Sequence, residues 1–224
     1  MHLYRGFRLV AIVEPFRFAG AKLAMIDDLD RTVEYLLKRE LSPALADQVS
    51  ISFAAPDSDF PPPAVTLPAV DLFLYDVREN NDLRSIQWII ERSVDGTATR
   101  RRAPVRIDCS YLITAWASEA SSSRALDEHR LLSEVIKALI RYPVLPEVFL
   151  QGLLQGQDPA LPATTLQPGR LQSVAEFWQA LGGKPKAALN YTVTIGIASD
   201  APIETERPVL DRTLKMSPEV EVTV

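Results

Sequence analysis

The sequence predicts an α+β fold, a single domain in which a mixed or antiparallel sheet carries helices packed on one face. Two patterns indicate the strands and the helices. Residues 104–116 and 187–197 alternate apolar and polar side chains, which is typical of strands with one face on a core. Residues 26–45 and 124–141 repeat apolar side chains every three or four positions, as helices with one buried stripe do.

The composition excludes several classes of protein. The chain has 224 residues, of which 47% are hydrophobic and 24% charged, so it can bury a sizeable core without disulfides or metals. A net charge of -5 argues against a general nucleic-acid binder, which usually shows a basic face. The single cysteine, Cys109, excludes an internal disulfide and a multi-cysteine metal site. No apolar run approaches the ~18 residues of a membrane span, so we expect no membrane insertion.

The N-terminal part divides at Met25. Residues 1–24 hold a short apolar run interrupted by Glu14 and Arg17, which is a poor secretory signal, and we read them as an N-terminal extension. Alternatively, translation starts at Met25. The first helix begins there with acidic residues in its first turn, where the helix dipole favours them, and Pro43 marks its end. A short strand at 49–54 and a proline-rich loop at 56–68 follow.

A central strand and a basic hairpin come next. Residues 70–77 are apolar on both faces except for Asp71 and Asp76, which favours a strand inside a sheet. A polar stretch, 78–84, leads to a strand at 85–93. The pair Asp95-Gly96 predicts a hairpin turn, and residues 97–104 return to the long strand that begins at 104.

The C-terminal half alternates helices and loops. Serines 121–123 precede the second long helix, and Pro143 stops it. We expect a short strand within 146–154, a loop at 155–169 and a short helix that opens on Ser173 and Glu176 as a capping box. The last strand follows, so the predicted organisation is an extension (1–24), the domain (25–199) and an extended arm (200–224).

No familiar catalytic or metal motif is present, and we expect neither an enzyme nor a cofactor. Asp71 and Asp76 are an odd number of residues apart, which predicts opposite strand faces and contacts at strand ends or with solvent. Cys109 lies on the apolar face of its strand and is expected to be buried. A hydrolase with Cys109 as nucleophile remains an alternative, and it requires Cys109 to be exposed beside His129.

One charge cluster stands out, the run Arg100-Arg101-Arg102 with Arg92 and Arg106 near it. It is either a solvated arm that discourages edge pairing or a docking surface for an acidic partner, since arginine binds carboxylates through forked donors. Trp88 is expected to be a half-buried hairpin residue, of a type that is also a frequent interface anchor. A single-strand nucleic-acid platform is a weaker reading, because only this one aromatic residue accompanies the arginines.

Five segments, taken in order, resemble one family, the cap or tail-terminator proteins of extracellular contractile injection systems, which are phage-tail-like particles. The resemblance covers about residues 25–212, and it depends on the order and spacing of the segments. They are MIDDLDRTVEYLLKREL from Met25, VDLFLYDVREN from Val70, PVRIDCSYLITAWA from Pro104, EVIKALIRYP from Glu134 and SVAEFWQALGGKPKAALNYTVTIGI from Ser173.

The resemblance implies a structural protein that forms a six-membered ring on the end of the finished inner tube and sheath. Such a ring stops polymerisation and ties the last sheath layer to the tube. Its partners would be other copies of the chain and the tube and sheath proteins, with assembly in the cytoplasm and release as part of the particle. The alternative is an assembly chaperone or adaptor that never joins the particle.

A ring needs heterologous contacts, which exposed strand edges and extended arms supply. Two surfaces are therefore the candidate interfaces, the basic hairpin and the C-terminal arm. Their candidate contact residues are Trp88, Arg92, Arg100, Arg101 and Arg102 on the hairpin and Glu204, Arg207, Leu210 and Arg212 on the arm.

Overall fold

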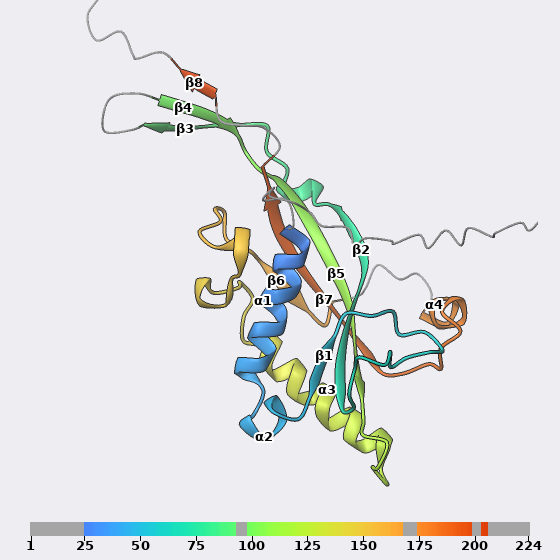
Figure 1. Ribbon diagram of the computed structural model, residues 1–224. Helices are drawn as coiled ribbons and strands as arrows, with labels where there is room; N and C mark the ends of the chain where they lie inside the picture. The colour runs from blue at the N-terminus through green and yellow to red at the C-terminus, as the bar shows by residue number, and fades with distance from the viewer. Residues whose placement is uncertain (1–24, 93–97, 168–173, 199–202, 206–224) are drawn as a thin grey trace, which may run out of the picture.

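The main sheet is built around two long central strands, β2 (Ala69–Glu79) and β5 (Val105–Trp116). The computed structural model describes residues 25–92, 98–167, 174–198 and 203–205 (Figure 1). The other strands of this sheet are β1 (Ser50–Ser52), β7 (Ala188–Ile197) and β6 (Ala163–Thr165), and the order is β1-β2-β5-β7-β6. Only β1 pairs in parallel, so the predicted mixed sheet is confirmed.

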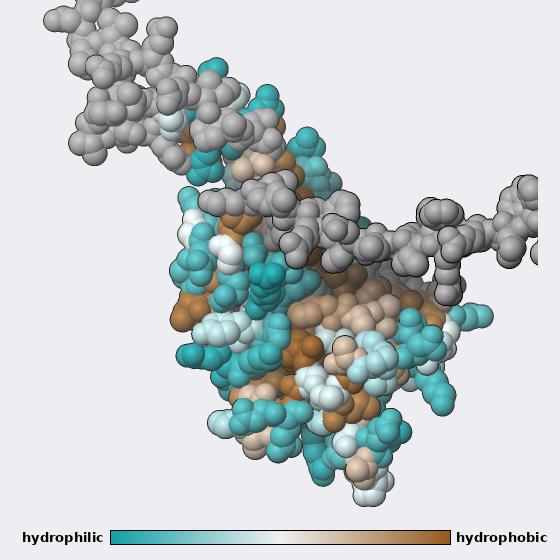
Figure 2. Space-filling model, in the orientation of Figure 1, coloured by the Kyte–Doolittle hydropathy of each residue, from teal (hydrophilic) through white to brown (hydrophobic). Residues whose placement is uncertain are grey.

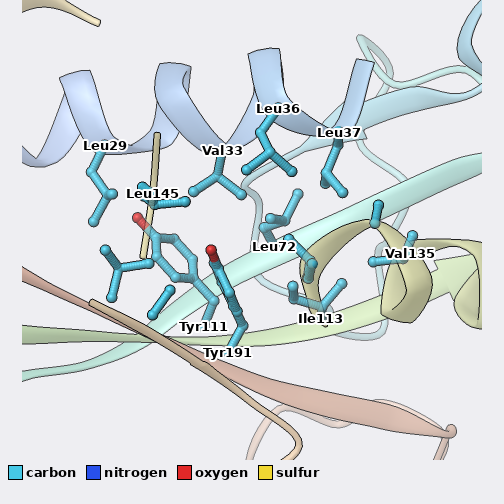
Figure 3. Close-up of a cluster of buried hydrophobic side chains, with 14 of the residues drawn as sticks. Leu29, Val33, Leu36, Leu37, Leu72, Tyr111, Ile113, Val135, Leu145 and Tyr191 are labelled. Atoms are coloured by element: carbon cyan, nitrogen blue, oxygen red, sulfur yellow. The ribbon is translucent and has the colours of Figure 1, made fainter. Parts of the chain in front are cut away.

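The two long helices, α1 (Met25–Glu40) and α3 (Arg124–Ile140), pack on one face of this sheet (Figure 1). The alternation of β5 and β7 turns their apolar residues toward these helices, because successive side chains of a strand point to opposite faces. Figure 3 shows the resulting core, in which side chains from α1 meet those of the strands. Its labelled members are Leu29, Val33, Leu36, Leu37, Leu72, Tyr111, Ile113, Val135, Leu145 and Tyr191.

One segment differs from the sequence-based expectation because α1 supplies its hydrogen-bond partners. Residues 146–154 form two 3-10 helices, η2 (Glu147–Phe149) and η3 (Gly152–Leu154), and not a strand. The Leu153 N–H donates to the Asp28 carboxylate at 2.9 Å, and the Gln151 N–H donates to the Thr32 hydroxyl at 3.0 Å. Side chains of α1 therefore accept hydrogen bonds from these backbone N–H groups, so the segment does not need to pair with another β-strand.

Two further boundaries were predicted wrongly. The first helix ends at Glu40, and a separate one-turn helix, α2 (Pro43–Ala46), follows, because the ring of Pro43 disfavours a helical conformation in the residue before it. The expected loop at 155–169 contains β6, which pairs with β7.

A second hydrophobic layer covers part of the opposite face of the sheet. The short helix α4 (Val174–Ala180) lies there (Figure 1), with the Phe177 ring 6.1 Å from that of Phe73 and Trp178 buried. In the loop after β1, Phe60 stacks on Trp116 with ring centroids 4.2 Å apart. The long helices thus share one face, as predicted, while α4 lies on the other.

A bulge at Tyr75 corrects the prediction for the two aspartates of β2. The register of β2 on β5 shifts between Leu74 and Asp76, so that Asp71 lies opposite Thr114 and Asp76 opposite Ser110. One extra residue in a strand reverses its alternation. Asp71 and Asp76 therefore lie on the same face of the sheet, although an unbroken strand would place them on opposite faces.

Candidate assembly interface

A two-stranded hairpin extends beyond the main sheet at one end of β5. Its strands are β3 (Trp88–Arg92) and β4 (Ala98–Arg102), and the short strand β8 (Ile203–Thr205) pairs with β4 on the other side. Figure 1 shows this three-stranded hairpin sheet standing away from the helices. The predicted turn at Asp95-Gly96 lies outside the described residues.

The base of the hairpin is fixed by Asn80. This residue follows β2 and caps the 3-10 helix η1 (Asn81–Leu83), its side-chain oxygen accepting from the Leu83 N–H at 3.0 Å. Its amide nitrogen donates to the Asp108 carboxylate at 3.0 and 3.2 Å, and the Thr194 hydroxyl donates to the same carboxylate at 2.7 Å. Strands β5 and β7 thereby hold the turn that redirects the chain into β3.

Arg106 lies at the same base but does not belong to the exposed arginine cluster. Its side chain is buried, and its guanidinium donates to the carbonyl oxygens of Pro159 at 3.2 Å and Ala160 at 3.0 Å. Burial lowers the pKa of this guanidinium. Arg106 is near the arginine run in sequence, but its side chain is buried and fastens a loop to β5.

The exposed face of the hairpin combines an indole ring with two arginines. Trp88 lies directly opposite Arg102, and Ile90 opposite Arg100, so these four side chains share one face. The guanidinium carbons of Arg100 and Arg102 lie 4.9 and 5.3 Å from the centroid of the Trp88 ring, which is cation–π geometry. Trp88 is 42% exposed and Ile90 60% exposed.

Exposed apolar side chains gather around this hairpin and the strand end that precedes it. The set comprises Val77, Leu83, Ile86, Trp88 and Ile90. Figure 2 shows hydrophobic residues interspersed with hydrophilic ones on the part of the hairpin that it colours. Large apolar side chains that cluster on a surface mark interaction sites more often than scattered ones do. Ile86 and Ile90 were not singled out from the sequence, where alternation alone does not distinguish a free strand face from a covered one.

The other predicted interface residues lie elsewhere in the hairpin sheet or outside the described residues. Arg101 lies on the opposite, more covered face of β4, and Arg92 is the last residue of β3. Glu204 is the middle residue of β8 and pairs through its backbone with Thr99. Arg207, Leu210 and Arg212 lie outside the described residues, as does the extension at 1–24. The structure brings Trp88, Arg100 and Arg102 together and attaches part of the C-terminal arm to the same sheet.

The residues considered for catalysis do not form a catalytic site. Cys109 is fully buried, and burial is the main cause that raises the pKa of its thiol to about 12, whereas a nucleophilic cysteine needs access and a lowered pKa. The structural condition for a cysteine hydrolase is therefore not met. Within the described residues, no group of His, Cys, Asp and Glu side chains could hold a metal ion.

Asp71 is buried rather than a strand-end or solvent contact. Neither of its carboxylate oxygens makes a hydrogen bond to a described residue, although the nearby Ser52 hydroxyl and Ala54 N–H act to lower its pKa. Burial outweighs them and raises the pKa of Asp71 to about 7. The Asp71 side chain is fully buried.

A separate groove of about 710 Å³ lies between α2 and α3. Leu45, Val49 and Leu131 are among its apolar lining residues, and Asp127, Arg130, Glu134 and Lys137 supply both signs of charge. These charges pair with one another, Arg130 with Asp127 at 3.0 Å and Lys137 with Glu134 at 2.7 Å. None of the described helices is long and apolar enough to cross a membrane.

Comparison with known proteins decides the family. Residues 28–212 match the Pvc16 N-terminal domain family. This chain is a member of that family. The resemblance inferred from the sequence is thereby confirmed, and the match includes the hairpin, α3 and all five strands of the main sheet.

Two solved structures share the fold of this Pvc16 N-terminal domain. One is the sheath/tube terminator, in its extended state, of PVC, an extracellular contractile injection system, with a TM-score of 0.62, 26% identity and 88% of this chain covered. The other is the tube-terminating cap of the anti-feeding prophage, with a TM-score of 0.59, 25% identity and 91% of this chain covered. The matches span 65% and 66% of those two chains. A search of curated proteins finds no match.

Several residues of the segments that carried the resemblance contact one another. Tyr111 donates to Asp30 at 2.7 Å, which joins the long strand to the acidic start of α1. Asn80 of the "REN" turn donates to Asp108, and the Trp116 indole donates to Thr114 at 2.9 Å. These spacings are therefore explained by bonds within the Pvc16 N-terminal fold itself, and the bond between Asn80 and Asp108 also holds the base of the hairpin.

Proposed function

We propose that this protein is a cap of a contractile injection system, a terminator that closes the end of the inner tube and sheath. The observation that carries the proposal is the double match, to a sheath/tube terminator and to a tube-terminating cap, across 88% and 91% of this chain. The fold agrees with it, because it presents an exposed hairpin with Trp88, Arg100 and Arg102 on one face.

The proposed assembly is a homohexameric ring on the last layer of the particle. Closed rings need two different surfaces on each copy that fit each other. The C-terminal arm, residues 201–224, is the candidate for one of these surfaces, because its strand β8 already adds to the hairpin sheet. In this proposal the hairpin contacts tube or sheath, and the C-terminal arm lies on a neighbouring copy or on sheath.

The stoichiometry of purified particles tests the proposal. A cap remains in the particle at about one ring for each complete tube, so quantitative mass spectrometry should find it in a constant, low ratio to the tube protein. An assembly chaperone or adaptor would be present in the assembling cell and missing from purified particles. Finding no copy in intact particles would contradict the cap.

Two variants then test the two surfaces. Reversal of charge at Arg100, Arg101 and Arg102 should impair particle assembly, and unchanged assembly would exclude the hairpin as the contact with tube or sheath. A chain that ends after Ser199 should fail to cap, and normal capping would exclude the C-terminal arm. The reversal at Arg130, an exposed arginine of α3, is the matched control.

A further inference from the structure

The hairpin sheet has one strand edge left open. Its order is β3-β4-β8, so β3 is outermost, and no other strand of the described chain pairs with its outer edge. The edge of β4 that faces away from β3 is already covered by β8, which belongs to the C-terminal arm. An unpaired edge presents a row of N–H and C=O groups that can bind a further strand.

The two faces beside this edge differ in chemistry. On one face, the guanidinium groups of Arg100 and Arg102 lie over the Trp88 ring, so both side chains lean from β4 toward β3 and its open edge. On the other face, Ile89 lies opposite Arg101 and lines a mainly apolar hollow of about 230 Å³ with Leu83 and Pro104. A strand that fits this edge therefore carries acidic side chains on one face and apolar side chains on the other.

The sequence of the C-terminal arm contains one segment of this kind. In residues 218–224, PEVEVTV, Glu219 and Glu221 alternate with Val220, Val222 and Val224, and no basic residue interrupts them. As a strand, the segment would place both glutamates on one face and the three valines on the other. In one of the two possible orientations of its faces on β3, the segment places its glutamates beside Arg100 and Arg102 and its valines beside Ile89.

We propose that residues 218–224 of a second copy add as a strand to the outer edge of β3. The inference rests on the proposed function, because a ring brings hairpins of neighbouring copies close together. Backbone hydrogen bonds supply the pairing. The Arg100 and Arg102 guanidinium groups select the acidic face, since arginine bonds carboxylates through forked donors.

The direction of β8 shows where the rest of the C-terminal arm starts. Thr205 pairs with Ala98 and Ile203 with Arg100, so β8 runs toward the hairpin tip and its C-terminal end points away from the main sheet (Figure 1). The 12 residues from 206 to 217 can span up to ~40 Å when extended. This reach also exceeds the width of the arm's own hairpin sheet, in which neighbouring strands lie ~4.8 Å apart, so the choice of a second copy rests on the proposed ring.

Cysteine cross-linking of the full-length protein tests the pairing. Ile89→Cys is combined with Val220→Cys or with Val222→Cys, and the buried Cys109 does not compete. Mild oxidation should give covalent dimers and higher multimers from at least one of the two pairs, and none from the single variants. A cross-linked monomer, which means that the arm pairs with its own hairpin, overturns the proposal, and so does the absence of any cross-link.

Charge reversal tests the selection of the acidic face. Arg100→Glu with Arg102→Glu, or Glu219→Lys with Glu221→Lys, should each lower the cross-linked fraction about tenfold, as expected for two lost charge pairs. All four changes together should restore cross-linking, and Arg130→Glu should leave it unchanged. Cross-linking that resists both reversals, or that the fourfold variant does not recover, overturns the assignment. Circular dichroism of each variant confirms that the domain still folds.

Particle assembly separates this inference from the proposed function. If a chain that ends at residue 216 caps particles normally and the full-length cysteine variants give no cross-link to a neighbour, the strand exchange is refuted while the cap stands. If purified particles contain no copy of the protein, the cap is refuted, and the cross-linking experiment still decides the pairing by itself.

Discussion

Tyr111 and Asp30 join the long central strand to the first turn of α1, with the Tyr111 hydroxyl donating to the Asp30 carboxylate at 2.7 Å. Tyr191 lies directly opposite Tyr111 on β7, and its hydroxyl is buried with no hydrogen-bond partner among the described residues. Figure 3 shows both hydroxyls on the side of the sheet that faces α1. Two adjacent tyrosines thus differ only in whether the helix supplies an acceptor.

Tyr111→Phe should destabilise the protein, and Tyr191→Phe should not. The first change leaves the part-buried Asp30 carboxylate without this donor, and burial already raises the pKa of that group. The cost is about 1–3 kcal/mol in the free energy of unfolding. The second change removes an unpaired hydroxyl, so stability should stay level or rise. Urea unfolding of both variants measures the difference, and equal losses would contradict the role of the Asp30 bond.

The buried Asp71 should make stability fall as pH rises from about 4 to about 7. Burial raises the pKa of this carboxyl to about 7 in the folded chain, while the unfolded chain ionises near ~3.9. Between these values the folded state binds more protons than the unfolded state, so raising the pH favours unfolding. The full loss is ~4 kcal/mol from a shift of this size.

Asp71→Asn should remove that pH dependence and stabilise the protein at pH 8. Thermal unfolding across the pH range checks it, with the exposed Asp59→Asn as the control that should keep the wild-type slope. A stability curve for Asp71→Asn that runs parallel to the wild type would show that Asp71 is not the responsible carboxyl.

Trp88→Ala should leave stability nearly unchanged while lowering incorporation into particles. The indole packs on the hairpin surface, and exposed cation–π contacts contribute only ~0.5–1 kcal/mol each. At an interface, replacing an anchoring tryptophan by alanine typically costs roughly 2–4 kcal/mol of binding free energy. Incorporation measured by mass spectrometry should therefore fall well over tenfold. Leu126→Ala, at another exposed apolar side chain, should assemble normally.

Cys109 should resist thiol reagents in the native protein. Its side chain is fully buried, and the pKa of its thiol is raised to about 12, chiefly by burial, so almost no thiolate is present or accessible at pH 8. Labelling should proceed only as the chain unfolds, and denatured protein should react at once. Rapid labelling of the native protein would reopen the hydrolase alternative.

The sequence predicts well those helices and strands whose periodic pattern of apolar residues extends over many positions. The strand at Val105–Trp116 matches the alternation of residues 104–116, and α3 at Arg124–Ile140 matches its apolar repeat, because burial on one face imposes a period on many residues. The segment 146–154 was predicted wrongly because Asp28 and Thr32 bind its backbone. Those bonds cross more than 100 positions of sequence and leave no local signal.

The candidate interface was also predictable only in part, because contacts between distant residues leave no local signal in the sequence. The arginine run and Trp88 were visible as residue types, but the Tyr75 bulge, which reverses the alternation of β2, was not. The burial of Arg106 depends on the carbonyl oxygens of Pro159 and Ala160, and composition does not reveal such a contact. Only three-dimensional pairing separates the exposed arginines from the buried one.

The proposed cap is tested most directly by electron microscopy of particles from cells that lack this protein. We predict tubes and sheaths of uncontrolled or unstable length, with uniform particles restored when the intact chain is supplied. Capped particles of normal, uniform length in its absence would contradict the terminator role.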